Sequence, residues 1–442
     1  MKASKLEFNP NKIEAVWTDG SLDQELDYFQ GNTMFNFYVD FLIAGLLCFA
    51  HSHHVPTHHH HDHHPPSEDH SNSSYLKIAP RNAYFAFKVF HQLVSENAGK
   101  NVFFSPLSIS AAFAMVSMGA KSNTLSQLLT ALGFNQTEFN EQEIHEGFHQ
   151  LLHLLNLPQS ETELSTGNAL FTHEENKILT KFLDDARHYY HADVFPTNFT
   201  NLKEAELQIN SYIENKTQMR DVIQGLDKET VMVLVNYIFF KAYWLRPFYA
   251  EYTREDDFFV DEQTTVKVPM MITSDMFKFY HDKDLSCQVV QVPYKGKASA
   301  LFILPDPGKL KLVEDALGKD VLFKWLSSLQ YWHIDLYLPR FSVSSSHDVK
   351  EVLQSLGATK VFTNCSDLSG ISENPKMKVS KAIHKAYLNV YENGTEAAAG
   401  TFLSFSPQSE PHVIKFQNPF LVILSLENNI LFMGSIKNPT DK

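Results

Sequence analysis

The sequence predicts an α+β fold, and the order of its segments is the main reason. Segments with the spacing of amphipathic helices come early in the chain, and apolar or alternating segments typical of strands come late. No glycine-rich phosphate loop is present. This order favours an α+β arrangement over a doubly wound parallel sheet.

The N-terminal part begins with two segments of unlike composition. Residues 1–33 are polar, whereas residues 34–50 form an apolar run that ends in the small-x-small sequence Cys48-Phe49-Ala50. Such a run is typical of a secretory signal peptide and is short for a bilayer span. We therefore predict a signal peptide at 34–50, with Met34 as the true start and 1–33 as an upstream extension.

Residues 51–74 form a histidine-rich segment, with ten histidines between 51 and 70 and interleaved prolines. A hydrophobic core cannot be built from this composition, so we expect a flexible segment. One interpretation is a low-specificity site for zinc, copper or nickel, with His58, His59, His60 and His61 as weak candidates. The other is a solvated spacer that titrates near neutral pH. The sequence leaves both open, and we predict no cofactor.

Residues 75–442 keep a globular composition, without a second linker or repeat, and predict one large domain. One helix begins with Ser105 as N-cap and Pro106 as its first residue, and stops near Gly119. Another begins after Thr124 as N-cap, carries leucines at one face, and closes at Gly133.

Several strands are predicted in the same domain. The apolar run 231–240 suits a strand covered on both faces, with Asn236 as its single polar residue. The other predicted strands are 300–304, the alternating Ile334, Leu336 and Leu338, and a hairpin of 420–426 and 430–433 joined by Glu427-Asn428-Asn429.

Charge and cysteine content exclude some classes of protein. The formal net charge of -14 argues against nucleic acid or an anionic membrane as the main partner. Three cysteines are too few for a disulfide scaffold and lack the spacing of a structural zinc site. Once Cys48 is removed with the signal peptide, Cys287 and Cys365 form one pair or stay as two free, buried thiols.

The five residues His145-Glu146-Gly147-Phe148-His149 match the H-E-x-x-H motif of zinc hydrolases. On a helix this motif places two imidazoles around Zn²⁺, with the glutamate as base. However, a glycine inside a helix costs about 1 kcal/mol, and no G-x-x-H extension follows. We interpret the segment as an amphipathic helix with surface histidines, and we expect the protein not to be an enzyme.

Six N-x-S/T sequons are consistent with a secreted glycoprotein. They stand at Asn72, Asn135, Asn198, Asn215, Asn364 and Asn393.

The segment 391–416 carries two patterns at once. As a strand, it would place Thr395, Ala397, Ala399 and Thr401 on one face without a charge among them. Its glycines and prolines are instead typical of an exposed loop, and they are Gly394, Gly400, Pro407 and Pro411. The segment can therefore be an exposed loop that is able to enter a sheet over a core.

Several long stretches resemble the serpins, and within them the plasma group that includes antitrypsin and kallistatin. They are NVFFSPLSISAAFAMVSMGAKS at 101–122, VLVNYIFFKAYWLRPF at 233–248, VKVPMM at 266–271, VSKAIHKAYLNVYENGTEAAAG at 379–400 and NPFLVILSLENNILFMGSIKNPT at 418–440. The resemblance covers 75–442. It implies a serpin fold, with three β-sheets, eight to nine helices and an exposed reactive-centre loop.

The resemblance also implies a suicide-substrate inhibitor of an extracellular serine protease. The protease attacks the loop and forms a covalent acyl complex, and the cut loop then inserts as a new strand into the main sheet. Glu392 fits the family's glutamate sixteen residues before the scissile bond, which places that bond between Gln408 and Ser409. Because Gln408 suits no common specificity, Phe405 is an alternative cleavage site.

The implied hinge spans eight residues, of which 394–399 match the inhibitory pattern G-T-E-A-A-A. The hinge residues are Gly394, Thr395, Glu396, Ala397, Ala398, Ala399, Gly400 and Thr401. The strand pattern agrees, because a buried unpaired charge on the inward face would stall insertion. We expect a glycan on Asn393, if attached, to slow insertion.

Five residues match the family's sheet-opening region. Ser105, Ser108, Asn236 and His384 lie beneath the main sheet in that pattern, and we expect their side chains to hydrogen-bond one another. Trp244 matches the aromatic residue at the top of the sheet, where insertion begins.

Two other functions compete with inhibition. Related serpins carry steroid or thyroid hormone near the C-terminal hairpin, which is short here and has no aromatic residue to stack on a steroid. The zinc hydrolase is the second. We favour a secreted, extracellular, monomeric inhibitor that binds neither nucleic acid nor membrane.

Overall fold

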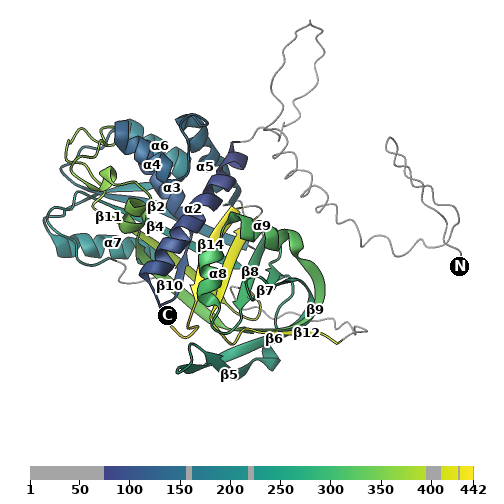
Figure 1. Ribbon diagram of the computed structural model, residues 1–442. Helices are drawn as coiled ribbons and strands as arrows, with labels where there is room; N and C mark the ends of the chain where they lie inside the picture. The colour runs from purple at the N-terminus through teal and green to yellow at the C-terminus, as the bar shows by residue number, and fades with distance from the viewer. Residues whose placement is uncertain (1–73, 156–161, 218–222, 395–409, 427–428, 442) are drawn as a thin grey trace, which may run out of the picture. The chain divides into compact units, whose positions relative to one another are not determined.

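The structure is a computed structural model, and it describes residues 74–155, 162–217, 223–394, 410–426 and 429–441 (Figure 1). In these ranges it has nine α-helices and two short 3₁₀ helices, Ala250–Tyr252 and Lys360–Phe362. The α-helices are α2 (Tyr75–Glu96), α3 (Pro106–Ser117), α4 (Ser122–Ala131), α5 (Glu141–Leu155), α6 (Thr180–Tyr190), α7 (Leu202–Thr217), α8 (Leu310–Ala316), α9 (Lys319–Ser328) and α10 (Lys350–Ser355).

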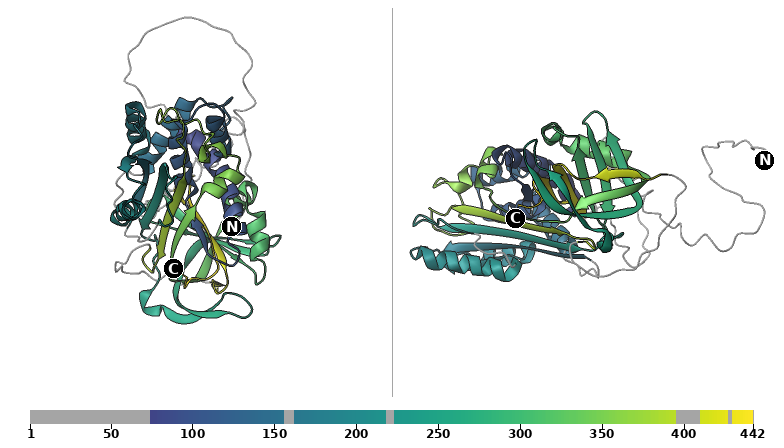
Figure 2. Two further views of the ribbon diagram at one scale, coloured as in Figure 1. Left: turned by 90° about the vertical axis from the view of Figure 1, so that its left-hand side faces the viewer. Right: turned by 90° about the horizontal axis from the view of Figure 1, so that it is seen from below.

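A five-stranded sheet lies between two layers of helices. Its order is β10 (Phe341–Asp348), β11 (Lys381–Val390), β4 (Met232–Ala242), β2 (Thr162–His173) and β3 (Asp193–Thr197). β4 is antiparallel to β2 but parallel to β11. On one face α3 packs against β4 and β2 and α6 packs near β3, and on the other face α7 packs against β4. The right-hand view of Figure 2 shows helices on both sides of the sheet.

The two faces of this sheet belong to different hydrophobic clusters. Along β4, Leu234, Ile238 and Phe240 join the large core, whereas Val233 and Val235 pack in a smaller cluster with residues of α7. This alternation has the period of two that a strand imposes. The prediction that 231–240 is a strand covered on both faces is therefore confirmed.

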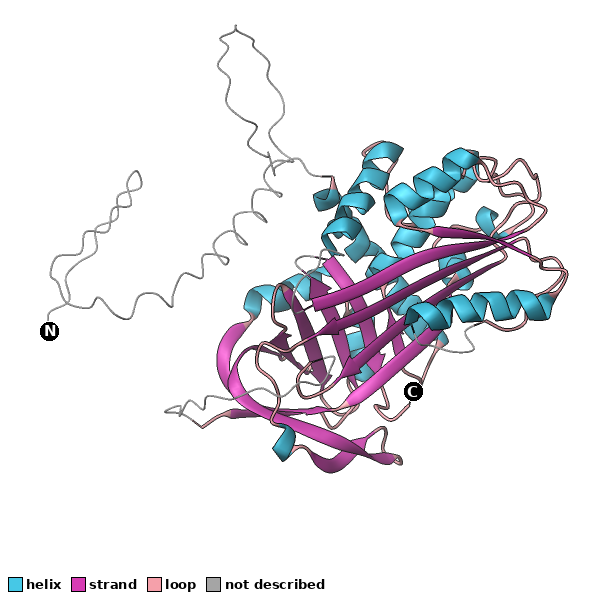
Figure 3. Ribbon diagram, turned by 180° about the vertical axis from the view of Figure 1, so that it is seen from behind, coloured by secondary structure: helices cyan, strands magenta, loops and turns pink. Residues whose placement is uncertain are grey.

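The remaining strands form a nine-stranded sheet that contains two groups. The order is β1 (Val102–Phe104), β14 (Asn429–Ile436), β13 (Phe420–Leu426), β8 (Ala298–Pro305), β7 (Cys287–Pro293), β6 (Thr265–Asp282), β9 (Gln330–Pro339) and β12 (His412–Lys415), with β5 (Arg254–Phe259) also paired to β6. The long strand β6 pairs with β5 and β9 and, through residues 278–282, with β7. β6 therefore joins two groups of strands, one made of β1, β14, β13, β8 and β7 and the other of β5, β9 and β12. With the five-stranded sheet, these two groups account for the three expected β-sheets, two of which are hydrogen-bonded to each other through β6. Figure 3 shows both sheets from behind, with the helices around them.

The predicted helix at Ser105 is confirmed, and it positions the site described below. Ser105 has extended backbone, and its side chain accepts a hydrogen bond from the Ser108 N–H at 3.2 Å. The helix ends at Ser117, two residues before the predicted stop. Gly119 then packs so closely that an added Cβ would lie 2.2 Å from Ile371 Cγ1.

The predicted N-cap Thr124 is wrong. α4 begins at Ser122, and the Thr124 hydroxyl instead accepts a hydrogen bond from the Asp367 N–H at 2.9 Å. A partner 243 residues away therefore replaces the local cap. The closing glycine is confirmed, because Gly133 has φ +85° directly after the end of α4.

The predicted strands 300–304 and 334–338 are confirmed as parts of β8 and β9, and the C-terminal hairpin as β13 paired antiparallel to β14. Glu427 and Asn428 lie outside the described residues. In the described part of the chain, no helix combines the length and apolar character needed to span a membrane.

Candidate functional site

β4 and β11 lie side by side at the centre of the five-stranded sheet. Seven consecutive parallel pairs join them, from Lys381 opposite Val233 to Tyr387 opposite Phe239. β11 ends four residues before Gly394, where the predicted hinge begins. A strand that follows β11 and enters this sheet beside it has to separate β11 from β4 or from β10.

Four polar residues from three elements meet beneath this pair of strands. Ser105 and Ser108 come from the start of α3, Asn236 from β4 and His384 from β11. Asn236 Oδ1 accepts a hydrogen bond from Ser108 Oγ at 2.9 Å and one from His384 Nδ1 at 2.6 Å. The Ser105 N–H donates to His384 Nε2 at 2.9 Å. The structure thus brings these four predicted residues into one network.

Sequence reasoning missed two members of this network, both on β2. Asn236 Nδ2 donates to Asn168 Oδ1 at 2.8 Å, and Ser108 Oγ lies 3.2 Å from Thr166 Oγ1. Asn168 stands directly opposite Asn236 in the register of β2 and β4. The only signal in the sequence is a polar residue beside apolar ones, which indicates a buried partner without identifying it.

The hydrogen bonds of His384 fix its tautomer. A backbone N–H can only donate, so Nε2 is an acceptor. The proton of the neutral ring is therefore on Nδ1, which donates a hydrogen bond to Asn236 Oδ1. Burial, and next the charges of His347 and Lys385, hold the pKa of His384 well below its ordinary value. A second proton on Nε2 would face the Ser105 N–H. The network therefore requires a neutral imidazole.

Trp244 lies just beyond the end of β4, outside this network. Its indole N–H donates to the Tyr391 carbonyl at 2.9 Å, and its backbone N–H donates to the Asn393 carbonyl at 2.8 Å. Its ring stacks on Tyr294 with centroids 4.0 Å apart. Trp244 therefore ties the end of β4 to the base of the predicted loop.

Glu392 also anchors the base of the predicted loop, through contacts of its own. It is 8% exposed, and its carboxylate accepts a hydrogen bond from Thr253 Oγ1 at 2.8 Å. Arg340 forms an ion pair with it at 3.4 Å. The Phe248 N–H donates to its carbonyl at 2.7 Å. Sequence reasoning used Glu392 only to locate the scissile bond and missed these contacts.

Gly394 is the hinge residue within the described part of the chain. Its φ is +134°, and an added Cβ would lie 2.1 Å from the Ala242 carbonyl oxygen, so the position requires glycine. The other predicted hinge residues, at 395–401, lie outside the described residues. So do the predicted bond between Gln408 and Ser409 and the alternative at Phe405.

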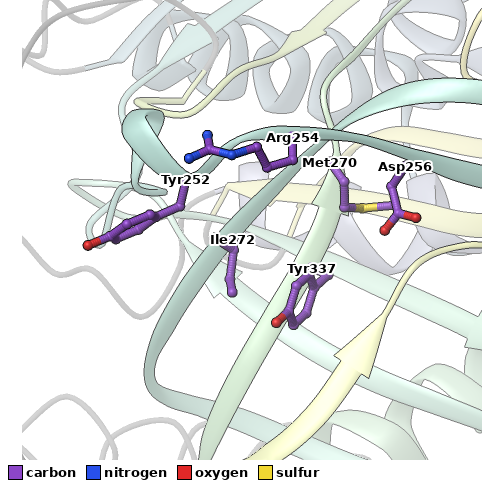
Figure 4. Close-up of a pocket in the computed structure, with 6 residues that line it drawn as sticks. All are labelled: Tyr252, Arg254, Asp256, Met270, Ile272 and Tyr337. Atoms are coloured by element: carbon purple, nitrogen blue, oxygen red, sulfur yellow. The ribbon is translucent and has the colours of Figure 1, made fainter.

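A cavity of about 330 Å³ is lined by residues of β5, β6 and β9 and by the 3₁₀ helix before β5 (Figure 4). Its lining combines a cation, a carboxylate and apolar surface, from Tyr252, Arg254, Asp256, Met270, Ile272 and Tyr337. The predicted hormone site beside the C-terminal hairpin is elsewhere, because that hairpin is made of β13 and β14.

The H-E-x-x-H motif does not form a zinc centre. His145 is 6% exposed, and its Nδ1 lies 2.6 Å from the Tyr190 hydroxyl. The prediction of surface histidines is therefore wrong for His145, because this side of α5 packs on α6. Burial lowers the pKa of His145 to about 4. In the described ranges, no three His, Cys, Asp or Glu side chains stand ready to hold a metal ion. His58 to His61 lie outside those ranges.

The two cysteines of the domain are both free thiols. The possible pair is therefore excluded. Cys287 is buried, which raises the pKa of its thiol to about 12, but Cys365 is exposed. The expectation of two buried thiols is wrong for Cys365, which follows the 3₁₀ helix at the surface.

The predicted glycosylation sites differ in exposure. Asn135, Asn215 and Asn364 are exposed, whereas Asn198 and Asn393 are half-buried. Asn72 lies outside the described residues.

Residues 80–439 match the family described as Serpin (serine protease inhibitor). The match spans most of the sequence, and this chain belongs to the serpin family.

Individual relatives agree with the family and its fold. The alpha-1-antiproteinase of Ovis aries is 46% identical over 375 residues, which are 84% of this chain and 90% of that protein. The structure of human glycosylated kallistatin has a TM-score of 0.79 at 43% identity, over 84% of this chain and 100% of that one. Human thyroxine-binding globulin complexed with thyroxine has a TM-score of 0.80 at 39% identity, over 83% and 100%. The predicted serpin fold and the resemblance to the antitrypsin and kallistatin group are thereby confirmed.

We predict that acid destabilises the folded protein through His384. In the unfolded chain its imidazole titrates near pH 6.5, whereas its pKa in the fold is far lower. The unfolded state therefore takes up the extra proton first, and stability falls as the pH drops below about 6.5. Urea denaturation midpoints at about pH 7.5 and 5.5 should differ more for the wild type than for His384→Gln. His145 and His347 are present in both proteins, so their contribution to the pH dependence is the same in each. An equal change of the urea midpoint between the two pH values in wild type and His384→Gln would contradict the prediction.

We also predict that Glu392→Ala destabilises the folded protein at the base of the loop, just beyond the end of β11. The variant leaves the Thr253 hydroxyl without its acceptor in a part-buried place, so the free energy of unfolding should fall by about 1–3 kcal/mol. Arg340 adds little to this loss, because its side chain is 41% exposed. Thermal unfolding measures the change, and Glu410→Ala, an exposed carboxylate beyond the loop, is the control. Equal midpoints for the two variants would refute the prediction.

Proposed function

We propose that the protein is an inhibitory serpin whose cleaved loop inserts between β4 and β11. The observation that carries this proposal is the pairing of Gly394. It forms antiparallel bridges both to Tyr391, just beyond β11, and to Tyr243, just beyond β4. Its backbone exchanges hydrogen bonds of 2.7 and 3.1 Å with Tyr391. One residue thus already stands between the extensions of the two strands, antiparallel to both.

Continuing this pairing gives each later hinge residue defined neighbours in an inserted strand. Residues 395, 397, 399 and 401 would stand opposite buried residues on both sides. These are Val390, Leu388, Ala386 and His384 on β11 and Ala242, Phe240, Ile238 and Asn236 on β4. Small, uncharged side chains are what such an environment accepts, which supports the hinge assignment.

Both registers bring Thr401 to the same place. His384 and Asn236 already stand opposite each other across β11 and β4, and Thr401 would arrive between them. Its hydroxyl group can then exchange hydrogen bonds with the buried network of α3, β4 and β11. The polar network therefore has a role in insertion that an apolar packing would not supply.

The chemistry of the proposal follows from the loop. The protease's serine attacks the carbonyl carbon of Gln408, an ester forms, and the amine of Ser409 leaves with a proton. Insertion then carries the acyl enzyme away before water can cleave the ester. The antiproteinase name of the sheep relative supports an inhibitor. We propose further that residues 34–50 are a signal peptide, that the sequons carry glycans and that inhibition is extracellular.

We predict that Ala397→Arg abolishes inhibition, whereas Ala398→Arg preserves it. An arginine at 397 would be buried beside Leu388 and Phe240, both at most 1% exposed. At 398 it would lie beside Tyr387 and Phe239, which are half-exposed. A buried unpaired charge costs several kcal/mol, so the 397 variant should be cleaved as an ordinary substrate, with about tenfold or more of it cleaved per protease inhibited.

The ratio of cleaved to complexed inhibitor, read on denaturing gels, measures this difference. Equal ratios for the two variants would show that the hinge does not enter the sheet in this register.

The test of the function itself is incubation with trypsin, chymotrypsin, and pancreatic and neutrophil elastases. We expect an SDS-stable complex with at least one of them, and mass spectrometry should place the cut after Gln408, or after Phe405 with a chymotrypsin-like enzyme. The cleaved protein should also gain thermal stability. Cleavage by every enzyme without complex or gain in stability would overturn the proposal.

The second candidate is a non-inhibitory carrier of a hydrophobic hormone. The similarity to thyroxine-binding globulin complexed with thyroxine favours it. Fluorescence titration with thyroxine and cortisol discriminates, because saturable submicromolar binding, roughly 8 kcal/mol or more, would support a carrier. The hinge composition favours the inhibitor.

A further inference from the structure

Four histidines gather where α5 faces the C-terminal end of α6. We call them the histidine patch: His149, His153, His188 and His191. His149 and His153 lie one turn apart on α5. His188 is in the last turn of α6, and His191 is the residue that caps it. None of them has a role in the proposed inhibition.

The imidazole rings of this patch are close to one another. The rings of His149 and His188 stack with centroids 4.7 Å apart and planes 23° apart. The ring of His191 lies 6.1 Å from that of His149. His149 Nδ1 is buried and has no hydrogen-bond partner in the described part of the chain. A buried nitrogen without a partner is costly, and a ligand that binds it would recover that cost.

The surroundings of His191 favour its neutral form. Burial, and then the charges of His149, His153 and His188, lower the pKa of His191. A proton on any of these three rings thus disfavours protonation of His191. The flanking charged groups are Arg187 on α6, which is exposed, and Glu146 on α5, which is half-buried. Neutral imidazole is the form that coordinates metal ions.

We propose that His149, His188 and His191 form a binding site for a divalent transition ion of the zinc, copper or nickel class. These ions prefer imidazole nitrogen, whereas Mg²⁺ and Ca²⁺ prefer oxygen. In the described ranges, no three His, Cys, Asp or Glu side chains are placed to hold a metal ion as they stand, so binding requires the rings to rotate. His188 and His191 are exposed and free to do so.

The distances allow this rotation. Two nitrogens bound at about 2.0–2.1 Å to one tetrahedral ion lie roughly 3.3 Å apart. Rings that stack at 4.7 Å need only a modest turn to reach that separation. The site differs from the H-E-x-x-H centre, because Tyr190 holds His145 in the interior. A bound ion would link α5 to α6.

Titration calorimetry with Zn²⁺ tests the site on the full chain, with the ten histidines of 51–70 replaced by asparagine to remove their own metal binding. We expect one ion per chain in this background. His188→Gln should weaken binding about tenfold or more, and His281→Gln, an exposed histidine on β6, should leave it unchanged. Zn²⁺ should raise the thermal midpoint of the background protein, but Mg²⁺ should not.

Three outcomes would overturn the proposal: no Zn²⁺ bound by the background protein, equal affinity in the background and in His188→Gln, or equal loss in His188→Gln and His281→Gln. His188 is exposed, so its replacement should leave the fold intact, which circular dichroism checks. A His149→Gln variant that keeps the same fold should lose affinity as well.

Discussion

The direct pairing of β4 with β11 is the constraint on which the rest of this molecule depends. Seven parallel pairs close the centre of the five-stranded sheet, and the chain that leaves β11 turns back at Gly394, between the extensions of the two strands. An antiparallel strand placed there would replace one ladder of backbone hydrogen bonds by two. A closed sheet of this kind would thus gain hydrogen bonds if it opened to take up such a strand.

The members of the buried polar network depend on one another. Asn236 accepts two hydrogen bonds and donates to Asn168, and His384 bridges Asn236 to the backbone of α3. The loss of any member leaves a partner unsatisfied in the interior, which costs more than the bond itself contributes. An apolar residue at 236 could pack in the closed sheet, but it would offer Thr401 nothing to bind. The polar break in this strand therefore fits a sheet with two states.

Local signals in the sequence were reliable where the chain alone decides the structure. The cap at Ser105, the glycine after α4 and the two-sided burial of β4 follow from spacing and residue type. Contacts between distant residues were not predictable in this way. The Thr124 hydroxyl binds the Asp367 N–H instead of capping α4. His145 is buried against the Tyr190 hydroxyl instead of lying at the surface. The network residues were found through the family resemblance, whereas Asn168 required the register of β2 and β4.

The period of two along the hinge explains why its one charge stands at 396. Residues 395 and 397 would meet partners in the large core, so a carboxylate at either position would be buried without a counter-charge. Residue 396 would stand opposite Asn389 and Lys241 on the other face, where both neighbours are half-exposed and one is cationic. The inward face is limited further because α3 packs against β4 there, and the close contact of Gly119 with Ile371 fixes the chain just beyond α3. On that face the hinge carries only threonine and alanine, at 395, 397, 399 and 401.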